Sequence, residues 1–284
     1  MNSLTIDSIE FTKVDAGSVF VGDSSGGWIY ASQRPRHEVR CPDFYIMEEV
    51  LSLEQLSRIL DVDLLEGEEH VWEGARLEAL ISIINEKFDG NSLDIDTNIS
   101  WEIRCPSQGE WLLAKELEII RFSCGDKEIL CDAVSSNYRG AMMDGRPRIF
   151  TDHGPMKWHT ATMEIHPSKK EIFALSSAPM DRKNSGLSVR LVITPIREDN
   201  LVIVPNKADL ASNIKDELIW TSILGVLPSF AIPWLRGMGD YIYSGWANLL
   251  FGGICVGFVT GAFWRPRRAT IMYEDGEIIE SKIN

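Results

Sequence analysis

Three histidines in the second half of the chain have the chemistry of metal ligands: His153, His159 and His166, with Asp152 beside the first. Neutral imidazole is the most common protein ligand for transition metals. Spacings of six and seven residues do not place all three rings on one face of a helix, so the ligands would come from loops or strands. Two interpretations stay open, a three-histidine metal site and ordinary hydrogen-bonded loop histidines.

A second group of residues has the chemistry of an anion site. Residues 137–148 read NYRGAMMDGRPR, which places three arginines within ten positions in an otherwise acidic domain. Guanidinium groups form paired hydrogen bonds to carboxylates and phosphates. The candidate ligand-binding residues are Asn137, Arg139, Arg146, Arg148 and Trp158. The alternative is that these arginines form internal ion pairs with neighbouring carboxylates.

Composition and charge limit the partners of the 284-residue chain. It has 28 Lys and Arg against 42 Asp and Glu, a net charge of −14. Such a chain repels a phosphate backbone, so we expect no nucleic-acid partner. Almost all of the excess lies in residues 1–200, with 21 basic and 34 acidic side chains, whereas residues 201–284 carry 7 and 8. The last third of the chain is therefore suited to different surroundings.

Two apolar runs in that last third predict a transmembrane hairpin. Residues 218–235 and 243–264 contain no charged side chain, and a bilayer core needs about 20 apolar residues in a helix. Trp220, Trp234, Trp246 and Trp264 lie near the ends of the runs, where interfacial aromatic residues belong. The alternative is a pair of buried core helices in a soluble domain.

Charges around the hairpin predict its orientation, and its glycines suggest a contact. Arg265, Arg267 and Arg268 follow the second run, so the positive-inside rule places both ends, and the large N-terminal domain, in the cytoplasm. Gly253, Gly257 and Gly261 share one helix face. Small residues at this spacing allow close helix packing, so we expect that this face can form a homo-oligomer.

Local signals predict several elements before the hairpin. Ser52 with Gln55 and Ser107 with Glu110 form the pattern of a capping box, which opens helices at residues 53–60 and 108–117. Apolar side chains at helical spacing predict a third helix over residues 72–88. Short strands are expected around residues 11–21 and 36–46, and a final strand over residues 186–193.

The order of these segments resembles the formylglycine-generating enzyme, or sulfatase-modifying-factor, family, a variant of the C-type-lectin fold. The family pattern V-x-x-G-x-F-x-M-G corresponds to VDAGSVFVG at residues 14–22, and P-x-H-x-V with a following F-Y-I corresponds to PRHEVRCPDFYI at residues 35–46. The signature R-L-P-T-E-A-E-W corresponds to RCPSQGEW at residues 104–111, and G-F-R-V to GLSVRL at residues 186–191. The resemblance covers residues 8–197 and implies an α+β fold.

The departures from the family bear on function. Family members with the activity hold copper with two cysteines, but residues 132–254 contain no cysteine, and a thiolate copper site needs thiolates. The family segment R-G-G-S-W falls near residues 157–163, which read KWHTATM. Formylglycine generation is therefore not expected. A relative with this fold uses histidine-ligated iron, so the resemblance implies iron as the alternative for His153, His159 and His166.

The sequence thus predicts an α+β, C-type-lectin-like domain of the formylglycine-generating-enzyme type at residues 1–197. A linker at 198–216, a hairpin at 217–265 and a cytoplasmic tail at 266–284 follow. We expect a membrane-anchored, non-catalytic module that binds a protein or a small anionic ligand, with no catalytic residue and no cofactor. The alternative is an oxygen-dependent non-heme-iron oxidoreductase with the same fold.

Overall fold

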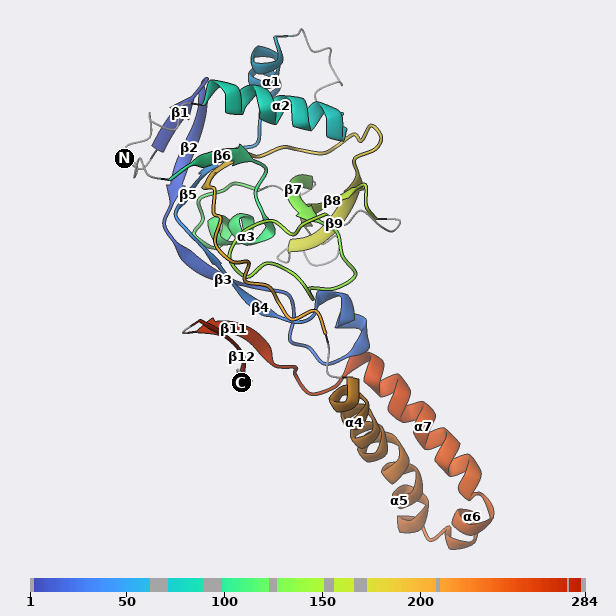
Figure 1. Cartoon of the computed structure of the whole chain (residues 1–284). Helices are drawn as coiled ribbons and strands as arrows, with labels where there is room; N and C mark the ends of the chain where they lie inside the picture. Colours follow the sequence, from blue (N-terminus) through green and yellow to red (C-terminus); the bar gives the residue numbers. More distant parts are fainter. Residues whose placement is uncertain are drawn as a thin grey trace. The chain divides into compact units, whose positions relative to one another are not determined.

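The computed structural model describes residues 3–61, 71–88, 99–122, 127–150, 156–165, 173–207, 210–274 and 276–281. The chain divides into two compact units. The first contains residues 1–21, 38–135 and 141–203, and the second contains residues 22–37, 136–140 and 204–284. Runs of strands and runs of helices follow one another along the chain (Figure 1), which agrees with the α+β class.

An antiparallel five-stranded sheet forms the centre of the first unit, in the order β1-β2-β5-β10-β6. Its strands are β1 (Ser3–Ile6), β2 (Ile9–Val14), β5 (Phe44–Met47), β10 (Val192–Pro195) and β6 (Trp101–Arg104). All four residues of β5 are buried, because this central strand is covered on both faces. The apolar core of the unit is built around Phe11, Leu80 and Leu191.

Two further groups of strands belong to this unit. Strands β3 (Gly17–Val21) and β4 (His37–Cys41) are neighbours in one sheet, and β7 (Lys127–Ala133), β8 (His159–Ile165) and β9 (Phe173–Pro179) form an antiparallel three-stranded sheet. The strands expected at residues 11–21 and 36–46 are thus present, each expected stretch corresponding to two strands.

The helices of the first unit begin where the sequence predicted. Both capping boxes are confirmed, at the starts of α1 (Leu53–Leu60) and α3 (Gln108–Glu116). The third predicted helix is α2 (Gly74–Lys87). In α2 the side-chain amide of Asn85 pairs with both backbone groups of Ile103 in β6, at 2.8 and 2.9 Å. The helix therefore satisfies polar groups of an edge strand that would otherwise be exposed to pairing.

The motif residues of the predicted family are structural in this unit. The guanidinium of Arg190, fully buried, donates to both carboxylate oxygens of Glu128 at 2.7 and 2.9 Å. Glu128 also accepts from the indole of Trp111 at 2.7 Å. The prediction of a strand over residues 186–193 is wrong in extent, because residues 188–191 divide their backbone hydrogen bonds between β7 and residues 47–51. Strand β10 begins only at Val192 and includes Pro195.

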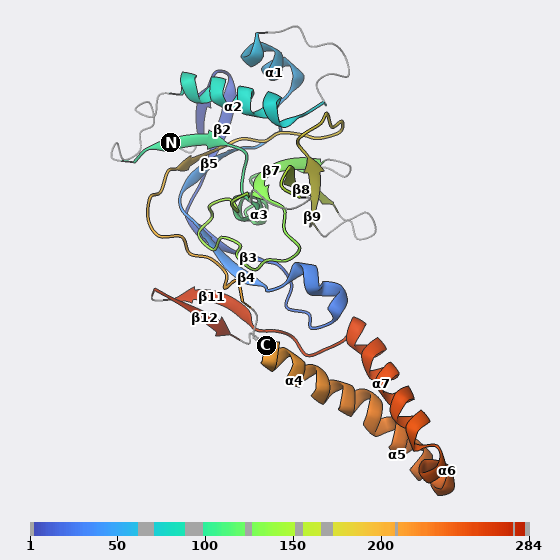
Figure 2. The same ribbon diagram turned by 45° about the vertical axis from the view of Figure 1, so that its right-hand side comes forward.

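A helical hairpin dominates the second unit. Its first limb runs through α4 (Leu210–Thr221), a π-helical turn at Ser222–Val226 and α5 (Leu227–Leu235). After the short α6 (Gly239–Ser244), α7 (Trp246–Phe263) returns beside it (Figures 1 and 2). Both limbs are long and apolar enough to span a membrane, and only 6% and 17% of their apolar windows are buried. They are therefore not buried core helices of this chain.

Glycines bring the two limbs into close contact. A side-chain carbon on Gly253 would lie 2.6 Å from Oγ of Ser229 and 2.7 Å from Cα of Val226, and one on Gly257 would lie 2.7 Å from the side chain of Thr221. The glycine face is thus occupied by the first limb of the same chain. The homo-oligomer through this face stays a prediction. A second copy of the chain could reach these glycines only by displacing Ser229 and Thr221 of the first limb.

The remaining parts of the second unit surround the base of the hairpin. A 3-10 helix, η1 (Trp28–Gln33), packs against α7 through Trp28 and Phe258, whose rings meet edge to face at 4.2 Å. After α7 the chain forms the hairpin of β11 (Thr270–Glu274) and β12 (Glu277–Ser281). Helix α4 begins within residues 198–216, which the sequence predicted to be a linker, and the predicted tail contains both of these strands.

Candidate functional site

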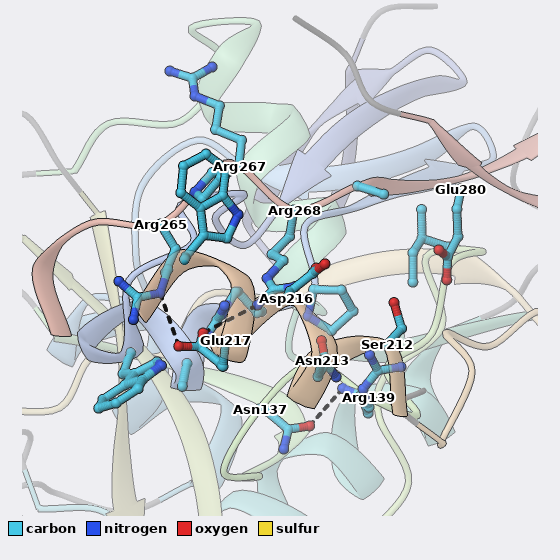
Figure 3. A pocket seen from close by; sticks show the side chains of 18 residues that line it. Asn137, Arg139, Ser212, Asn213, Asp216, Glu217, Arg265, Arg267, Arg268 and Glu280 are labelled. Atoms are coloured by element: carbon cyan, nitrogen blue, oxygen red, sulfur yellow. Dashed lines mark hydrogen bonds and ion pairs between the residues drawn. The ribbon is translucent and has the colours of Figure 1, made fainter. Parts of the chain in front are cut away.

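A pocket of about 670 Å³ lies at the base of the hairpin, entirely within the second unit (Figure 3). Four segments line it: η1 with the residues after it, residues 137 and 139, one face of α4, and the chain after α7 together with β12. The lining side chains that carry charge are Arg34, Arg139, Arg265, Arg267, Arg268, Asp216, Glu217 and Glu280. Five arginines therefore meet three carboxylates, inside a chain that is strongly acidic as a whole.

Two of these arginines are held by carboxylates on α4. Nε of Arg265 donates to Glu217 at 2.9 Å, and the Arg265 side chain is almost fully buried. Nη1 of Arg268 donates to Asp216 at 2.9 Å. Figure 3 shows both pairs side by side on α4. These contacts fix the chain after α7 on the helix and neutralise two of the five cations.

Arg34 and Arg267 are not held in this way. Among the residues that the structure describes, neither has a carboxylate within ion-pair distance. Arg34 donates to the carbonyl of Gly26 at 3.1 Å, and burial, together with the positive charge of Arg268, lowers the pKa of Arg34 from its ordinary value. Arg267 is exposed and points away from the ion pairs (Figure 3). Arg34 thus has only the longer-range attraction of Glu217 and Asp23, and neither side chain has an ion pair within the described structure.

Indole rings form the apolar part of the lining. Trp28 and Trp220 both line the pocket. The guanidinium of Arg265 lies 5.9 Å from the centre of the Trp28 ring, and Trp220 meets Trp264 edge to face at 5.5 Å. The pocket therefore offers a cationic side and an aromatic side to one ligand.

Two of the predicted ligand-binding residues belong to this pocket. Oδ1 of Asn137 accepts from the backbone N–H of Arg139 at 2.9 Å, which fixes the turn. Nη1 of Arg139 donates to the carbonyls of Pro205 and Lys207, both at 3.1 Å. The turn and its arginine are thus held in place at the wall of the pocket.

The other three predicted residues lie in the first unit and do not line the pocket. Arg146 makes hydrogen bonds to Asp144, at 2.6 and 2.9 Å, and to backbone carbonyls, which is the internal ion pairing that the sequence left as an alternative. The backbone N–H of Arg148 donates to Asp132 at 2.6 Å. Trp158 is 56% exposed, with the Lys157 ammonium 4.7 Å from its ring centre.

The histidine prediction is only partly covered by the structure. His153 and His166 lie outside the described residues, whereas His159 is the first residue of β8 and its Nδ1 is buried without a hydrogen-bond partner. Within the described part of the chain, no three His, Cys, Asp or Glu side chains are grouped to hold a metal ion. The three-histidine iron site therefore stays a prediction.

Three thiols in the described part of the first unit lie in surroundings that disfavour the thiolate. Burial raises the pKa of Cys105 to about 12 and raises those of Cys41 and Cys131 as well. The thiolate is the reactive and metal-binding form, so these three cysteines are protonated at neutral pH.

Sequence reasoning missed Arg34, Trp28 and the pairing of Arg265 with Glu217. Arg265, Arg267 and Arg268 had served only to orient the hairpin. The glycine-rich stretch before Trp28 is the one feature of the sequence that relates to the other two residues. A side-chain carbon on Gly27 would lie 2.8 Å from the carbonyls of residues 262 and 263. Gly27 permits the direct approach of this loop to the end of α7, which the sequence alone does not show.

Comparison with known proteins gives limited information. No protein-family model matches the chain, and no curated protein sequence matches it. Among solved structures the chain is similar to PvdO from Pseudomonas aeruginosa, with 12% identity and a TM-score of 0.49 over 68% of this chain and 97% of that one. It is similar to Treponema denticola variable protein 1, with 13% identity and a TM-score of 0.48 over 68% and 98%. Neither likeness bears on activity.

Proposed function

We propose that the chain is a membrane-anchored protein with a domain of the formylglycine-generating-enzyme type, in its C-type-lectin-like fold, and that it binds a small anionic ligand without transforming it. The observation that carries the proposal is the pocket at the base of the hairpin. Asn137 and Arg139 line it together with Arg34 and Arg267, two cations without an ion-paired carboxylate in the described structure.

The motif residues support the fold assignment and the absence of catalysis together. Arg104 and Glu110, from the signature segment, form an ion pair at 2.8 Å, and Glu110 also caps α3. Arg190 and Glu128 form a second buried pair. Retained motif residues therefore stabilise the fold, while the cysteines that copper chemistry needs are missing from the sequence.

The hairpin supports the membrane anchor. Large apolar side chains on both limbs are exposed, Leu227 to 66% and Phe251 to 70%, and exposed apolar surface of this extent belongs in lipid. Under the positive-inside rule, the basic residues after α7 favour a cytoplasmic location for the pocket and the N-terminal domain.

The pocket supports binding over chemistry. Arginine is always protonated and transfers no proton, and two of the three carboxylates are engaged in ion pairs. Guanidinium groups beside indole rings are well suited to hold a phosphate or carboxylate of an amphipathic molecule.

The test uses the full chain, first in membranes and then in detergent. We expect the chain to stay in the membrane after carbonate washing. In detergent, inorganic phosphate should raise the thermal midpoint of the protein, less so in Arg34→Gln, and equally in Arg236→Gln, whose exposed arginine lies at the far end of the hairpin. Release by carbonate, or equal responses in all three proteins, would overturn the proposal.

Elemental analysis of the same sample tests the iron alternative. About one iron per chain in the parent protein, lost in His159→Ala, would contradict the binding function and support an oxidative one. A folded chain without iron leaves the binding function in place.

A further inference from the structure

We infer that the pocket holds the phosphate headgroup of an anionic phospholipid drawn from the membrane that the hairpin spans. The inference rests on the proposed function and names its ligand. It follows from three observations on the second unit: the level of the pocket along the hairpin, the aromatic residues at that level, and the two arginines without carboxylate partners.

The first limb is longer than a membrane requires. Its 26 residues, Leu210–Leu235, extend over about 39 Å at 1.5 Å per residue, whereas the hydrocarbon core is about 30 Å thick. Its uncharged part begins at Leu218, so the turn that carries Asp216 and Glu217 lies outside the hydrocarbon. Arg265 is bonded to Glu217 and therefore lies at the same level. The pocket that these residues line is at the headgroup layer.

Aromatic residues mark the same level. Trp220 lies on α4 about one turn closer to the hydrocarbon than Glu217, and its ring packs against that of Trp264 at the end of α7. Trp28 packs against Phe258 of α7. Tryptophan rings prefer the interface between headgroups and acyl chains. Two of these indoles, Trp28 and Trp220, also line the pocket, so its aromatic side continues into the apolar surface of the hairpin.

The cations provide the selectivity for an anion. Arg265 and Arg268 are neutralised by Glu217 and Asp216, which leaves Arg34 and Arg267 to bind a phosphate. Basic pockets beside transmembrane helices on the cytoplasmic side are suited to anionic headgroups. A zwitterionic headgroup carries a cation of its own, which the arginines would repel.

A soluble anion would use only part of this arrangement. Free phosphate needs cations, but it gains nothing from two indole rings or from the adjacent exposed surface of Leu218, which is 65% exposed. A lipid uses all of them, with its phosphate on the arginines and its acyl chains along α4. We therefore assign the site to a lipid headgroup, and the free anion is an outcome of the test.

Native mass spectrometry of the full chain in detergent measures the binding directly. Dioleoyl phosphatidylglycerol and dioleoyl phosphatidylcholine are added separately. We expect retention of phosphatidylglycerol and about tenfold weaker retention in Arg267→Gln, because one charge-assisted hydrogen bond is lost. Arg267 is exposed and has no ion-pair partner among the described side chains, so this variant should fold. Arg34→Gln should have a similar effect, and Arg236→Gln should retain the lipid like the parent protein.

Competition with glycerol 1-phosphate separates the outcomes. If this soluble headgroup displaces little lipid at equal concentration, the lipid assignment stands. If glycerol 1-phosphate or inorganic phosphate binds as tightly as phosphatidylglycerol, the lipid assignment fails while the proposed anion-binding function survives. If neither glycerol 1-phosphate nor inorganic phosphate binds, and the parent protein retains both lipids equally, the lipid assignment and the proposed function both fail.

Discussion

Nε of Arg265 donates to Oε2 of Glu217 at 2.9 Å, across 48 residues of sequence. The same guanidinium reaches the carbonyl of Gly257 at 3.0 Å and the hydroxyl of Thr221 at 3.3 Å. Arg265 thus joins the end of α7 to α4 at the base of the hairpin. Because its side chain is almost fully buried, these partners take the place of the water that would otherwise solvate its charge.

Removal of the carboxylate should loosen the base of the hairpin. Glu217→Ala leaves the buried Arg265 without its charged partner, and we expect a loss of about 1–3 kcal/mol in unfolding free energy. A double-mutant cycle with Arg265→Leu in detergent measures the coupling between the two side chains. A coupling energy near zero would show that the pair does not stabilise the hairpin.

Substitution of the glycine face should separate the limbs. In Gly257→Leu the new side chain collides with Thr221, so we expect increased proteolysis of the hairpin tip and a lower thermal midpoint. Gly252→Leu is the matched control, since no described atom lies within 4 Å of its side-chain position. If chromatography shows that Gly257→Leu also halves the size of the particle, this face joins copies of the chain; equal sensitivity of both variants would contradict the packing described here.

The loop before Trp28 offers a test that removes no charge. A side-chain carbon on Gly26 would lie 2.7 Å from the carbonyl carbon of Arg265, so Gly26→Ala should displace this loop and weaken anion binding at the pocket. Gly239→Ala, at a position with no neighbour within 4 Å, should leave the binding unchanged. The phosphate-induced shift in thermal midpoint reports the difference, and an undiminished shift in Gly26→Ala would show that the loop does not form the site.

Asp132 predicts a pH dependence in the first unit. Burial raises its pKa to about 6 from 3.8, although the backbone N–H groups of Arg148 and Gln108 donate to it. The folded state then binds the proton more tightly than the unfolded state, so this group's contribution to stability falls as pH rises from about 4 to about 6. The shift corresponds to about 3 kcal/mol at most.

Comparison with Asp132→Asn isolates this group from the many other carboxylates. We expect the thermal midpoint of the parent protein, relative to that of the variant, to be higher at pH 4 than at pH 7. A difference that stays constant over this range would show that Asp132 titrates normally.

Sequence reasoning succeeded where the signal is local. The capping residues Ser52 and Ser107 and the uncharged runs of the hairpin act on their own neighbours in the chain. The strand expected at residues 186–193 was wrong in extent because residues 188–191 divide their backbone hydrogen bonds between β7 and residues 47–51, distant contacts that no local pattern contains. Distant carbonyls also separate two of the candidate arginines. Arg146 bonds to carbonyls near residue 199, in addition to Asp144, whereas Pro205 and Lys207 hold Arg139 at the pocket.

Sidedness of the hairpin tests the central claim most directly, that the pocket lies at the surface of a membrane that both limbs cross. Asp240→Cys, at the tip, and Glu277→Cys, in β12, are compared in sealed membrane vesicles with an impermeant maleimide, with the parent protein as the measure of native thiol labelling. We predict that Glu277→Cys is labelled only from the cytoplasmic face and Asp240→Cys only from the opposite face. Labelling of both positions from one face of intact vesicles would contradict the account.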